Sequence, residues 1–190
     1  MREQVLRATR ELTIEKGWDQ VRMSEVAESV GVSRPTLYKE FGDKKGLGDA
    51  LVVSEGQRFL AGIRAVLAEH VGDVQGGITA AVQFTLCEAE DSPLLKAVLT
   101  SNPSGNDDGG SSSTGVLPLL PTSASLLALC SGALTTWFND HFADLDPEDV
   151  ADVLVRLTVS HVVLPAADIA TTGERISRVA LRYLGVVHRL

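Results

Sequence analysis

The chain is poor in the residues from which sheets, disulfide frameworks and metal centres are built. Of its 190 residues only two are cysteines and 5% are aromatic, whereas 44% are hydrophobic, mostly Leu, Val and Ala. Two cysteines are too few for a disulfide framework or a four-ligand zinc site. A sheet would favour more aromatic and β-branched side chains, so the composition favours packed helices.

Several classes of segment and motif are also missing. No apolar run approaches the roughly 18 residues of a membrane-spanning helix, and the polar start, MREQ, is unlike a signal peptide. We therefore expect a cytoplasmic protein without a membrane partner. We find no nucleophile elbow, P-loop, dinucleotide glycine pattern or distinctive carboxylate pair, so nothing indicates an enzyme or a cofactor. No second ligand lies at metal-binding spacing from His141 or His161.

Charge is divided unevenly along the chain. The net charge of −8 would disfavour nucleic acid if it were spread evenly. Residues 1–45, however, carry nine Lys/Arg against eight Asp/Glu, whereas residues 46–190 carry eight against 17. Only the local field at a DNA-facing surface matters for docking. The acidity therefore does not exclude a nucleic-acid partner for the N-terminal part.

One stretch, from Met23 to Lys45, carries a distinctive pattern: MSEVAESVGVSRPTLYKEFGDKK. Its apolar residues recur at helical spacing, and Gly31 lies where the chain must turn between two short helices. Pro35 is placed in the first turn of the second helix, where its missing N–H is not needed. Polar donors project from that helix: Ser33, Arg34, Thr36, Tyr38 and Lys39. A helix that is apolar on one side and rich in donors on the other suits the major groove of DNA.

This pattern, with the preceding helix and its Lys16-Gly17 end, resembles the TetR family of bacterial repressors. The match covers roughly the first 47 residues, about a quarter of the chain. The resemblance implies an all-α protein with two parts. A three-helix helix-turn-helix DNA-binding domain is expected over residues 1–46, and a larger helical ligand-binding and dimerisation domain over residues 47–190.

Periodicity and capping residues predict the helices themselves. We expect them over residues 2–16, 24–31, 33–41, 44–69, 74–90, 93–99, 121–143, 147–164 and 172–187. Ser24, Ser33 and Asp43 are the expected N-caps of the second, third and fourth helices. Gly46 and Gly48 are poor helix formers, and either close backbone approach or flexibility would explain them. The Gly/Ser/Asp tract at about 102–115 is expected to be a mobile surface loop.

Three residues in the N-terminal part have roles that their own chemistry suggests. Arg34 can donate two hydrogen bonds to guanine O6 and N7, although a solvated surface arginine is the alternative. Thr36 can offer a methyl group to thymine or a hydroxyl to a phosphate. Lys44 lies at a helix start, where its charge and the free backbone amides both favour a phosphate.

Four further residues complete the expected DNA contacts. Tyr38 and Lys39 match positions that often contact the DNA backbone in TetR-like proteins, so the resemblance assigns them to phosphates. Partial packing against a neighbouring apolar side chain is the alternative for Tyr38. Ser24 and Ser33 can add hydroxyl or backbone contacts at two other helix starts.

The resemblance also implies partners for the C-terminal part. TetR-like proteins form homodimers, and the interface is expected on the helices over 147–164 and 172–187, whose excess apolar surface supports this independently. A two-fold dimer would bind a palindromic double-stranded DNA operator. The family usually holds an inducer between the helices expected here over residues 44–70, 75–90, 121–143 and 147–164.

The effector expected from the sparse polarity of these helices is small and lipophilic, such as a fatty acyl compound or a hydrophobic drug. For each candidate residue, ordinary core packing is the alternative to ligand contact. The candidate ligand-binding residues are Phe59, Ile63, Phe84, Cys87, Leu127, Cys130, Leu134, Trp137, Phe138 and His141.

These features favour a ligand-responsive repressor, and two alternatives remain open. One is a redox-sensing regulator that uses Cys87 and Cys130, although apolar surroundings would blunt both thiols. The other is a DNA-binding protein with a vestigial ligand domain.

Overall fold

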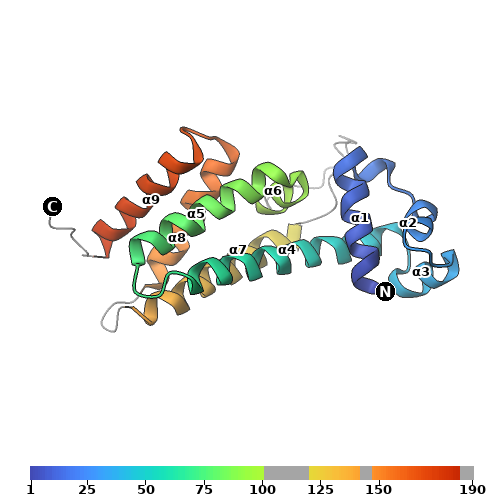
Figure 1. Cartoon of the computed structure of the whole chain (residues 1–190), viewed down its shortest axis with the longest axis horizontal. Helices are drawn as coiled ribbons and strands as arrows, with labels where there is room; N and C mark the ends of the chain where they lie inside the picture. Colours follow the sequence, from blue (N-terminus) through green and yellow to red (C-terminus); the bar gives the residue numbers. More distant parts are fainter. Residues whose placement is uncertain (101–119, 142–146, 185–190) are drawn as a thin grey trace.

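The computed structural model describes residues 1–100, 120–141 and 147–184, with only the backbone of residues 120–123. Within these ranges all regular secondary structure is helical, which confirms the expected all-α class. A small unit of three helices lies at one end and a larger bundle at the other, and α4 runs through both (Figure 1). The elements are α1 (Arg2–Lys16), the 3₁₀ helix η1 (Trp18–Gln20), α2 (Met23–Ser29), α3 (Arg34–Phe41), α4 (Lys44–Ala68), α5 (Val74–Asp91), α6 (Pro93–Thr100), α7 (Leu120–Asn139), α8 (Glu148–Val163) and α9 (Ile169–Tyr183).

The N-terminal unit closes a small apolar core of its own. Val5 of α1, Val26 of α2 and Leu37 of α3 are each at most 1% exposed. Trp18 in η1 is partly buried and packs against this core from the loop. The core continues without a break into the larger bundle through the buried residues of α4.

The turn between α2 and α3 has the geometry that its sequence predicts. Gly31 has a φ of 68°, in the left-handed region that glycine adopts without steric cost. The Ser33 hydroxyl oxygen accepts a hydrogen bond from the backbone N–H of Thr36, and Pro35 lies in the first turn of α3. These residues fix where α3 begins and how it leaves α2.

The start of α2 differs from the prediction. Ser24 is not the N-cap, because the helix begins at Met23 and no side chain caps it. Arg22 instead occupies the cap position with extended backbone, and its carbonyl accepts hydrogen bonds from the N–H groups of Glu25 and Val26. Burial of the Met23 side chain draws that residue into the first turn and moves Ser24 inside the helix.

The start of α4 shows why glycine occupies position 46. The Asp43 carboxylate accepts a hydrogen bond from the Gly46 N–H and so caps the helix as expected. A Cβ at Gly46 would lie 2.0 Å from the carbonyl oxygen of Phe41, the last residue of α3. Close backbone approach is therefore the reason for this glycine, and it holds the end of α3 directly against the start of α4.

The larger bundle packs α5 to α9 around the C-terminal half of α4. Phe59 of α4, Ile78 of α5, Leu95 of α6, Phe138 of α7 and Ala151 of α8 are each at most 1% exposed. α9 covers α5 and α8, and the Ser177 hydroxyl donates a hydrogen bond to the Gln75 carbonyl of α5. The bundle therefore has one continuous apolar interior, and α4 contacts it on several sides.

The last helix also begins earlier than predicted. α9 starts at Ile169 and not at Thr172, because Asp168 accepts hydrogen bonds from both the backbone N–H and the hydroxyl of Thr171. These hydrogen bonds lower the pKa of Asp168 below its ordinary value, as expected for a carboxylate that caps a helix. α8 begins at Glu148 and ends at Val163, close to its predicted limits.

Two further expectations concern residues that the structure does not describe. The tract at 102–115 and the predicted end of the last helix at residue 187 lie outside the described residues. Among the helices that the structure describes, none combines the length and apolarity needed to cross a membrane.

The contact at Gly46 generates a stability prediction. Replacing Gly46→Ala should destabilise the protein by about 1–3 kcal/mol, because the new methyl group forces the ends of α3 and α4 apart. Gly132→Ala is the matched control: it lies within α7 with nothing within 4 Å of an added Cβ, so helix propensity should stabilise it by up to about 1 kcal/mol. Urea unfolding followed by circular dichroism measures both changes. An equal change in the free energy of unfolding for the two variants would contradict the proposed contact.

Candidate nucleic-acid interface and apolar pocket

α3 has one buried side and one side that faces solvent. Leu37 and Phe41 are buried, whereas Arg34, Tyr38 and Lys39 are exposed. Arg34 and Tyr38 are four residues apart and so share one helix face. Tyr38 is 49% exposed, which leaves much of its side chain available to a partner. The structure thus presents three of the predicted DNA contacts on one short helix.

Ser33 and Thr36 interact with each other at the start of α3. Their hydroxyl oxygens are 2.7 Å apart, in addition to the hydrogen bond that caps the helix. Ser33 is exposed and Thr36 is partly exposed. Their first role is therefore to hold the N-terminal turn of α3, and the lone pairs and the methyl group of Thr36 remain for a partner.

Lys44 is held by the loop that follows α1. Its ammonium donates a hydrogen bond to the Asp19 carbonyl at 2.9 Å and lies 5.1 Å from the centre of the Trp18 ring. Two of the three ammonium hydrogens remain for a phosphate. The adjacent Lys45 is exposed and pairs with Asp49 within α4. The sequence prediction did not include Lys45, although it stands beside Lys44 at the same helix start.

A surface hollow of about 670 Å³ brings Ser24 and Arg34 together with Arg22. Arg22 is exposed and stands at the N-terminus of α2, and the sequence prediction missed it. A basic residue directly before the second helix was the signal that could have identified it. On the same rim Lys16 pairs with Glu25, and this hydrogen bond lowers the pKa of the Glu25 carboxyl.

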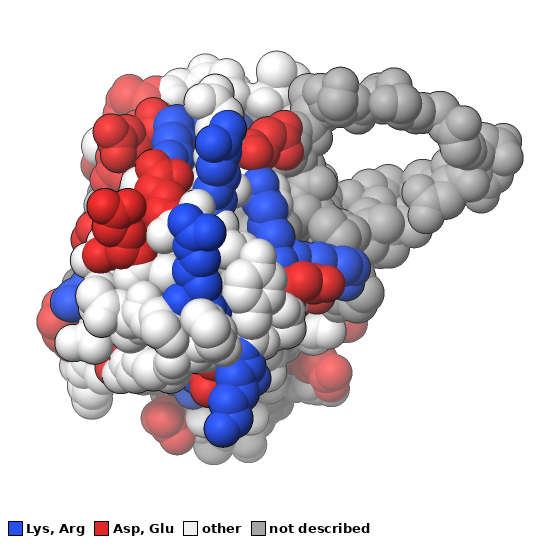
Figure 2. All heavy atoms as spheres, turned by 90° about the vertical axis from the view of Figure 1, so that its right-hand side faces the viewer, with Lys and Arg blue, Asp and Glu red and all other residues white. Residues whose placement is uncertain are grey.

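The end of the molecule that carries α1 to α3 has a divided charge pattern. In Figure 2 most of the Lys and Arg side chains lie down the middle of this face, while most of the Asp and Glu gather along one edge and a few lie beside the basic residues. Positive charge is therefore gathered locally on this face even though the whole chain carries −8. The arrangement agrees with the division of charge that the sequence shows.

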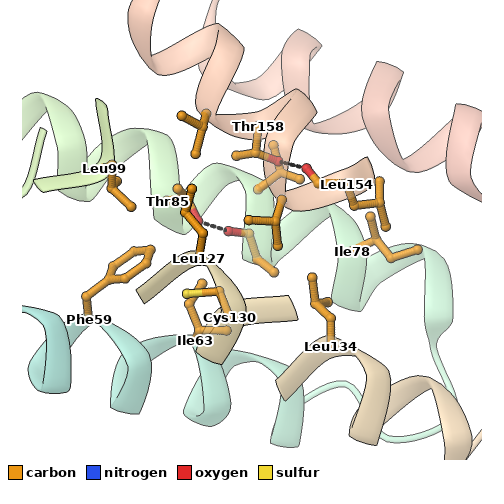
Figure 3. A pocket seen from close by; sticks show the side chains of 14 residues that line it. Phe59, Ile63, Ile78, Thr85, Leu99, Leu127, Cys130, Leu134, Leu154 and Thr158 are labelled. Carbon is orange, nitrogen blue, oxygen red and sulfur yellow. Dashed lines mark hydrogen bonds between the residues drawn. The ribbon is translucent and has the colours of Figure 1, made fainter. Parts of the chain in front are cut away.

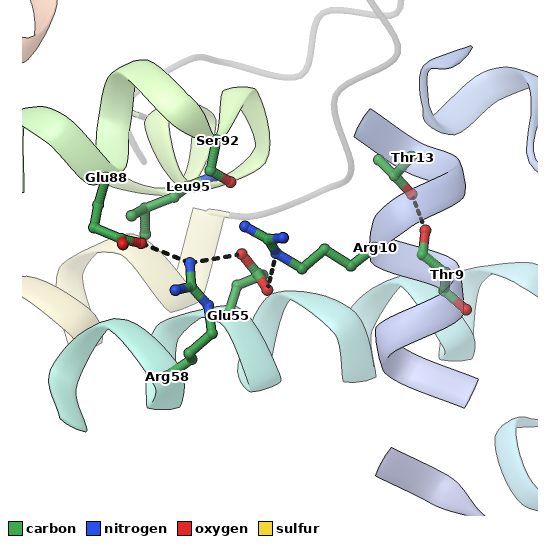
Figure 4. Close-up of polar contacts among 8 residues, drawn as sticks. All are labelled: Thr9, Arg10, Thr13, Glu55, Arg58, Glu88, Ser92 and Leu95. Carbon is green, nitrogen blue, oxygen red and sulfur yellow. Dashed lines mark hydrogen bonds and ion pairs between the residues drawn. The ribbon is translucent and has the colours of Figure 1, made fainter. Parts of the chain in front are cut away.

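A buried carboxylate joins the N-terminal unit to the bundle (Figure 4). Glu55 of α4 is 2% exposed, and its Oε1 lies 2.9 Å from Nε of Arg10 on α1. Its other oxygen lies 3.5 Å from Arg58, one turn further along α4. A carboxylate this deeply buried is tolerated only when it is paired. Glu55 therefore fixes α1 against the middle of α4.

The same network continues into α5. Arg58 Nη2 lies 2.7 Å from the Glu88 carboxylate. Partial burial alone would lower the pKa of the Arg58 guanidinium. The carboxylates of Glu88 and Glu55 together have the larger effect, so this pKa is raised above its ordinary value. A chain of four charged groups thus runs from α1 through α4 to α5.

An apolar cavity of about 40 Å³ lies inside the bundle. Figure 3 shows side chains converging on it from α4, α5, α7 and α8, with Leu99 of α6 at its edge. Five of the predicted ligand-binding residues line it: Phe59, Ile63, Leu127, Cys130 and Leu134. The sequence prediction missed its lining from α5 and α8, including Ile78, Val82, Thr85, Leu154 and Thr158.

The polar groups of this cavity are few and already engaged. The Thr85 hydroxyl donates to the Ala81 carbonyl and the Thr158 hydroxyl to the Leu154 carbonyl, each within its own helix. Burial raises the pKa of the Cys130 thiol to about 12, so this group stays neutral at physiological pH. No charged residue belongs to the lining among the residues described.

The other predicted ligand-binding residues lie elsewhere. Phe84 stacks on Phe59 with ring centres 5.8 Å apart, and Phe138 is fully buried behind the lining. Trp137 and His141 border a separate, open groove of about 770 Å³ that also contains Arg64. Cys87 is exposed and does not belong to the cavity lining. Direct ligand contact by any of the ten residues stays a prediction.

His141 has a structural role at the end of α7. Its Nε2 accepts a hydrogen bond from the Gly72 N–H, and its Nδ1 lies 2.7 Å from the Trp137 carbonyl oxygen. These partners assign the proton to Nδ1. No group of three His, Cys, Asp or Glu side chains in the described ranges can hold a metal ion.

The two cysteines have different surroundings, which weakens the redox alternative. Cys130 is buried, as expected from its apolar neighbours, but Cys87 is exposed and the expectation of apolar surroundings for it was wrong. Cys87 lies on the outer side of α5, where it can meet solvent but does not line the cavity. Two thiols that face solvent and core respectively are poorly placed to form a disulfide switch.

Both parts of the chain match families of known proteins. Residues 5–51 match the family described as bacterial regulatory proteins, tetR family, and residues 73–182 match the bacterial tetracyclin repressor, C-terminal domain. The HTH-type transcriptional regulator AlkX of Mycobacterium tuberculosis is 29% identical over 181 residues, which span 90% of this chain and 82% of that protein.

Solved structures show the same fold. The TetR family repressor AlkX from Dietzia sp. strain DQ12-45-1b, implicated in biodegradation of n-alkanes, has a TM-score of 0.68 and 25% identity, with 97% of each chain covered. The fatty acid degradation regulator FadR from Bacillus halodurans has a TM-score of 0.57 and 20% identity over 95% of this chain and 98% of that one. The FadR likeness concerns the fold alone.

The buried carboxylate generates a second stability prediction. Glu55→Gln should lower the free energy of unfolding by about 2–4 kcal/mol, because Arg10 loses its charged partner and Arg58 keeps only Glu88. The loss stays below that of fully enclosed pairs, since Arg10 and Arg58 reach solvent. Asp152→Asn, which removes an exposed pair with Arg156 in α8, is the control and should leave the urea midpoint unchanged. A double-mutant cycle with Arg10→Met measures the coupling, and a value near zero would disprove the proposed connection.

Proposed function

The chain belongs to the TetR family of bacterial transcription regulators, and from this premise we propose that it is a repressor that binds a palindromic operator as a homodimer and is released by a small apolar effector. The family consists of regulators and not enzymes. The observation that carries the proposal is the combination of a donor-bearing α3 with an apolar cavity, joined by one helix, α4. Such a repressor works in the cytoplasm, where the operator lies.

The DNA contacts follow from the exposed side of α3. Arg34 reads a guanine in the major groove, and Thr36 contacts a thymine methyl group or a phosphate. Tyr38, Lys39 and Lys44 hold phosphates and so set the position of α3 on the duplex. Ser24 and Ser33, with Arg22 added by the structure, contribute further backbone contacts. The DNA-binding domain covers about residues 1–46, and the remainder forms the ligand-binding and dimerisation domain.

A dimer supplies the second half of the recognition surface. One α3 is too short to read a long site, whereas two copies related by a two-fold axis read a palindrome. α8, the residue directly after it and α9 carry several large apolar side chains that are more than half exposed in the single chain: Val153, Val163, Leu164, Val179 and Tyr183. Pairing of α8 and α9 with the same helices of a second copy would bury them.

Effector control acts through a difference in affinity between two forms of the dimer. Phe59 and Ile63 line the cavity on α4, and Glu55, one turn before Phe59, holds α1. An effector that forces the cavity open therefore displaces α4 and moves the two α3 helices relative to each other. The similar AlkX repressor from Dietzia is implicated in biodegradation of n-alkanes, which supports an apolar effector for this chain as well.

Substitutions on α3 test the DNA-binding part of the proposal. DNA selected from a random pool by the purified protein should contain a palindrome. Arg34→Ala should weaken its binding by about 10–100-fold and relax the preference at one base per half-site. Lys39→Ala should weaken all sequences alike and reduce the salt dependence. Lys96→Ala on α6 removes the same charge from another exposed site and should have no effect. Fluorescence anisotropy measures each affinity, and unchanged binding by both α3 variants would refute these contacts.

Charge placed on α9 tests the dimer. Val179→Glu should raise the dimer dissociation constant by at least about tenfold, because a two-fold interface receives the buried carboxylate twice. Operator affinity should fall as the dimer is lost. Val71→Glu is the control, since Val71 is 81% exposed and lies in the turn after α4. Sedimentation analysis over a range of concentrations distinguishes the outcomes, and a Val179→Glu protein that stays dimeric would place the interface elsewhere.

A further inference from the structure

We propose that the cavity between α4, α5, α7 and α8 accepts an uncharged, unbranched hydrocarbon chain and rejects the ionised carboxylic acid of the same length. This inference rests on the proposed function, in which the cavity is the effector site. It goes further because the cavity is proposed to distinguish lipophilic ligands by their charge and their shape.

The described lining residues offer neither a cation nor a free strong hydrogen-bond donor to a carboxylate. An ionised carboxylate only accepts hydrogen bonds, so it needs donors or a cation. The donors of Thr85 and Thr158 are already bonded to carbonyl oxygens of their own helices. The thiol of Cys130 is a weak donor, and the other lining residues are apolar. A carboxylate placed here would lose its hydration without gaining a partner.

The basic residue that acts on this region lies outside the cavity. Arg64 of α4 lowers the pKa of Cys130 slightly against the stronger effect of burial. Its side chain is exposed and borders the open groove with Trp137 and His141, and it does not belong to the cavity lining. Arg64 therefore acts on Cys130 from outside the lining, and no Lys, Arg or His stands among the described residues that line the cavity.

The size of the cavity indicates the shape of the ligand. Its volume of about 40 Å³ holds one or two water molecules, so any effector must displace side chains. Ile63, Leu127 and Leu134 can change rotamer to open a narrow channel. A linear chain requires the smallest channel, whereas a bulky ring system would have to part the helices. The lining thus favours a thin, flexible, apolar molecule.

The primary experiment compares matched ligands on the full-length protein. Thermal unfolding is recorded at pH 7.5 with n-octane, methyl octanoate and octanoate. The two neutral compounds should raise the melting temperature, and their apparent affinity should exceed that of octanoate by at least about 100-fold. Lengthening the neutral chain should improve affinity by about fourfold per CH₂ until the cavity is filled. Equal affinity for octanoate, or no shift with the neutral compounds, would overturn the inference.

Two variants show whether charge in the cavity decides the selectivity. Arg64→Gln should leave the order of the three ligands unchanged, and loss of a strong octanoate response in this variant would instead reveal a carboxylate site at Arg64. Leu127→Arg, at a partly exposed lining position, should improve octanoate binding by at least about tenfold and weaken methyl octanoate. Circular dichroism confirms that this variant is folded. If it is not, the wild-type ligand series and Arg64→Gln still decide the question.

DNA release separates this inference from the proposed function. Each ligand is added to the complex of the protein with its selected DNA. Octanoate that binds and releases DNA as well as the neutral compounds overturns the selectivity but supports effector control. Neutral chains that bind selectively without releasing DNA support the selectivity and contradict effector control by the cavity.

Discussion

The ion pair between Glu55 and Arg10 is the interaction on which the relation between the two helical units depends. Apolar contacts between α1 and α4 contribute free energy but are non-directional, so they permit small sliding movements. A buried carboxylate with a guanidinium 2.9 Å away permits far less, because separation would leave Glu55 with only the more distant Arg58 as a partner. Arg58 and Glu88 extend this constraint to α5. The orientation of the DNA-binding unit is therefore specified from within the bundle.

α4 combines this constraint with the cavity. Between residues 51 and 63 it contributes Leu51 to the continuous core, pairs with α1 through Glu55 and lines the cavity with Phe59 and Ile63. A dense interior leaves side chains little free volume, so rotamer changes that admit a molecule also shift the helices that carry those side chains. One rigid element that touches all three places can convert occupancy of the cavity into a movement of α3.

Local signals in the sequence predicted most helix limits, and long-range contacts explain what was missed. Ser33 and Asp43 cap their helices through neighbours three residues away, so sequence identified both. The prediction of Ser24 as an N-cap was wrong because burial of Met23 moved the start of α2. The pairing of Arg10 with Glu55 joins residues 45 positions apart, which no periodic pattern reveals. Helical periodicity also marks buried faces without showing which buried residues border a cavity, and so the lining from α5 and α8 was absent from the prediction.

The backbone contact at Gly46 has a consequence for how such a regulator can diverge. The last carbonyl of α3 meets the first turn of α4 without an intervening side chain, so no rotamer change can absorb a displacement between them. The residues proposed to meet DNA, such as Arg34 and Thr36, are not among the neighbours of Gly46 and take no part in this contact. If Arg34 and Thr36 read bases as proposed, their replacement changes which DNA is bound while the connection to α4 is kept. Operator preference and effector response can evolve separately.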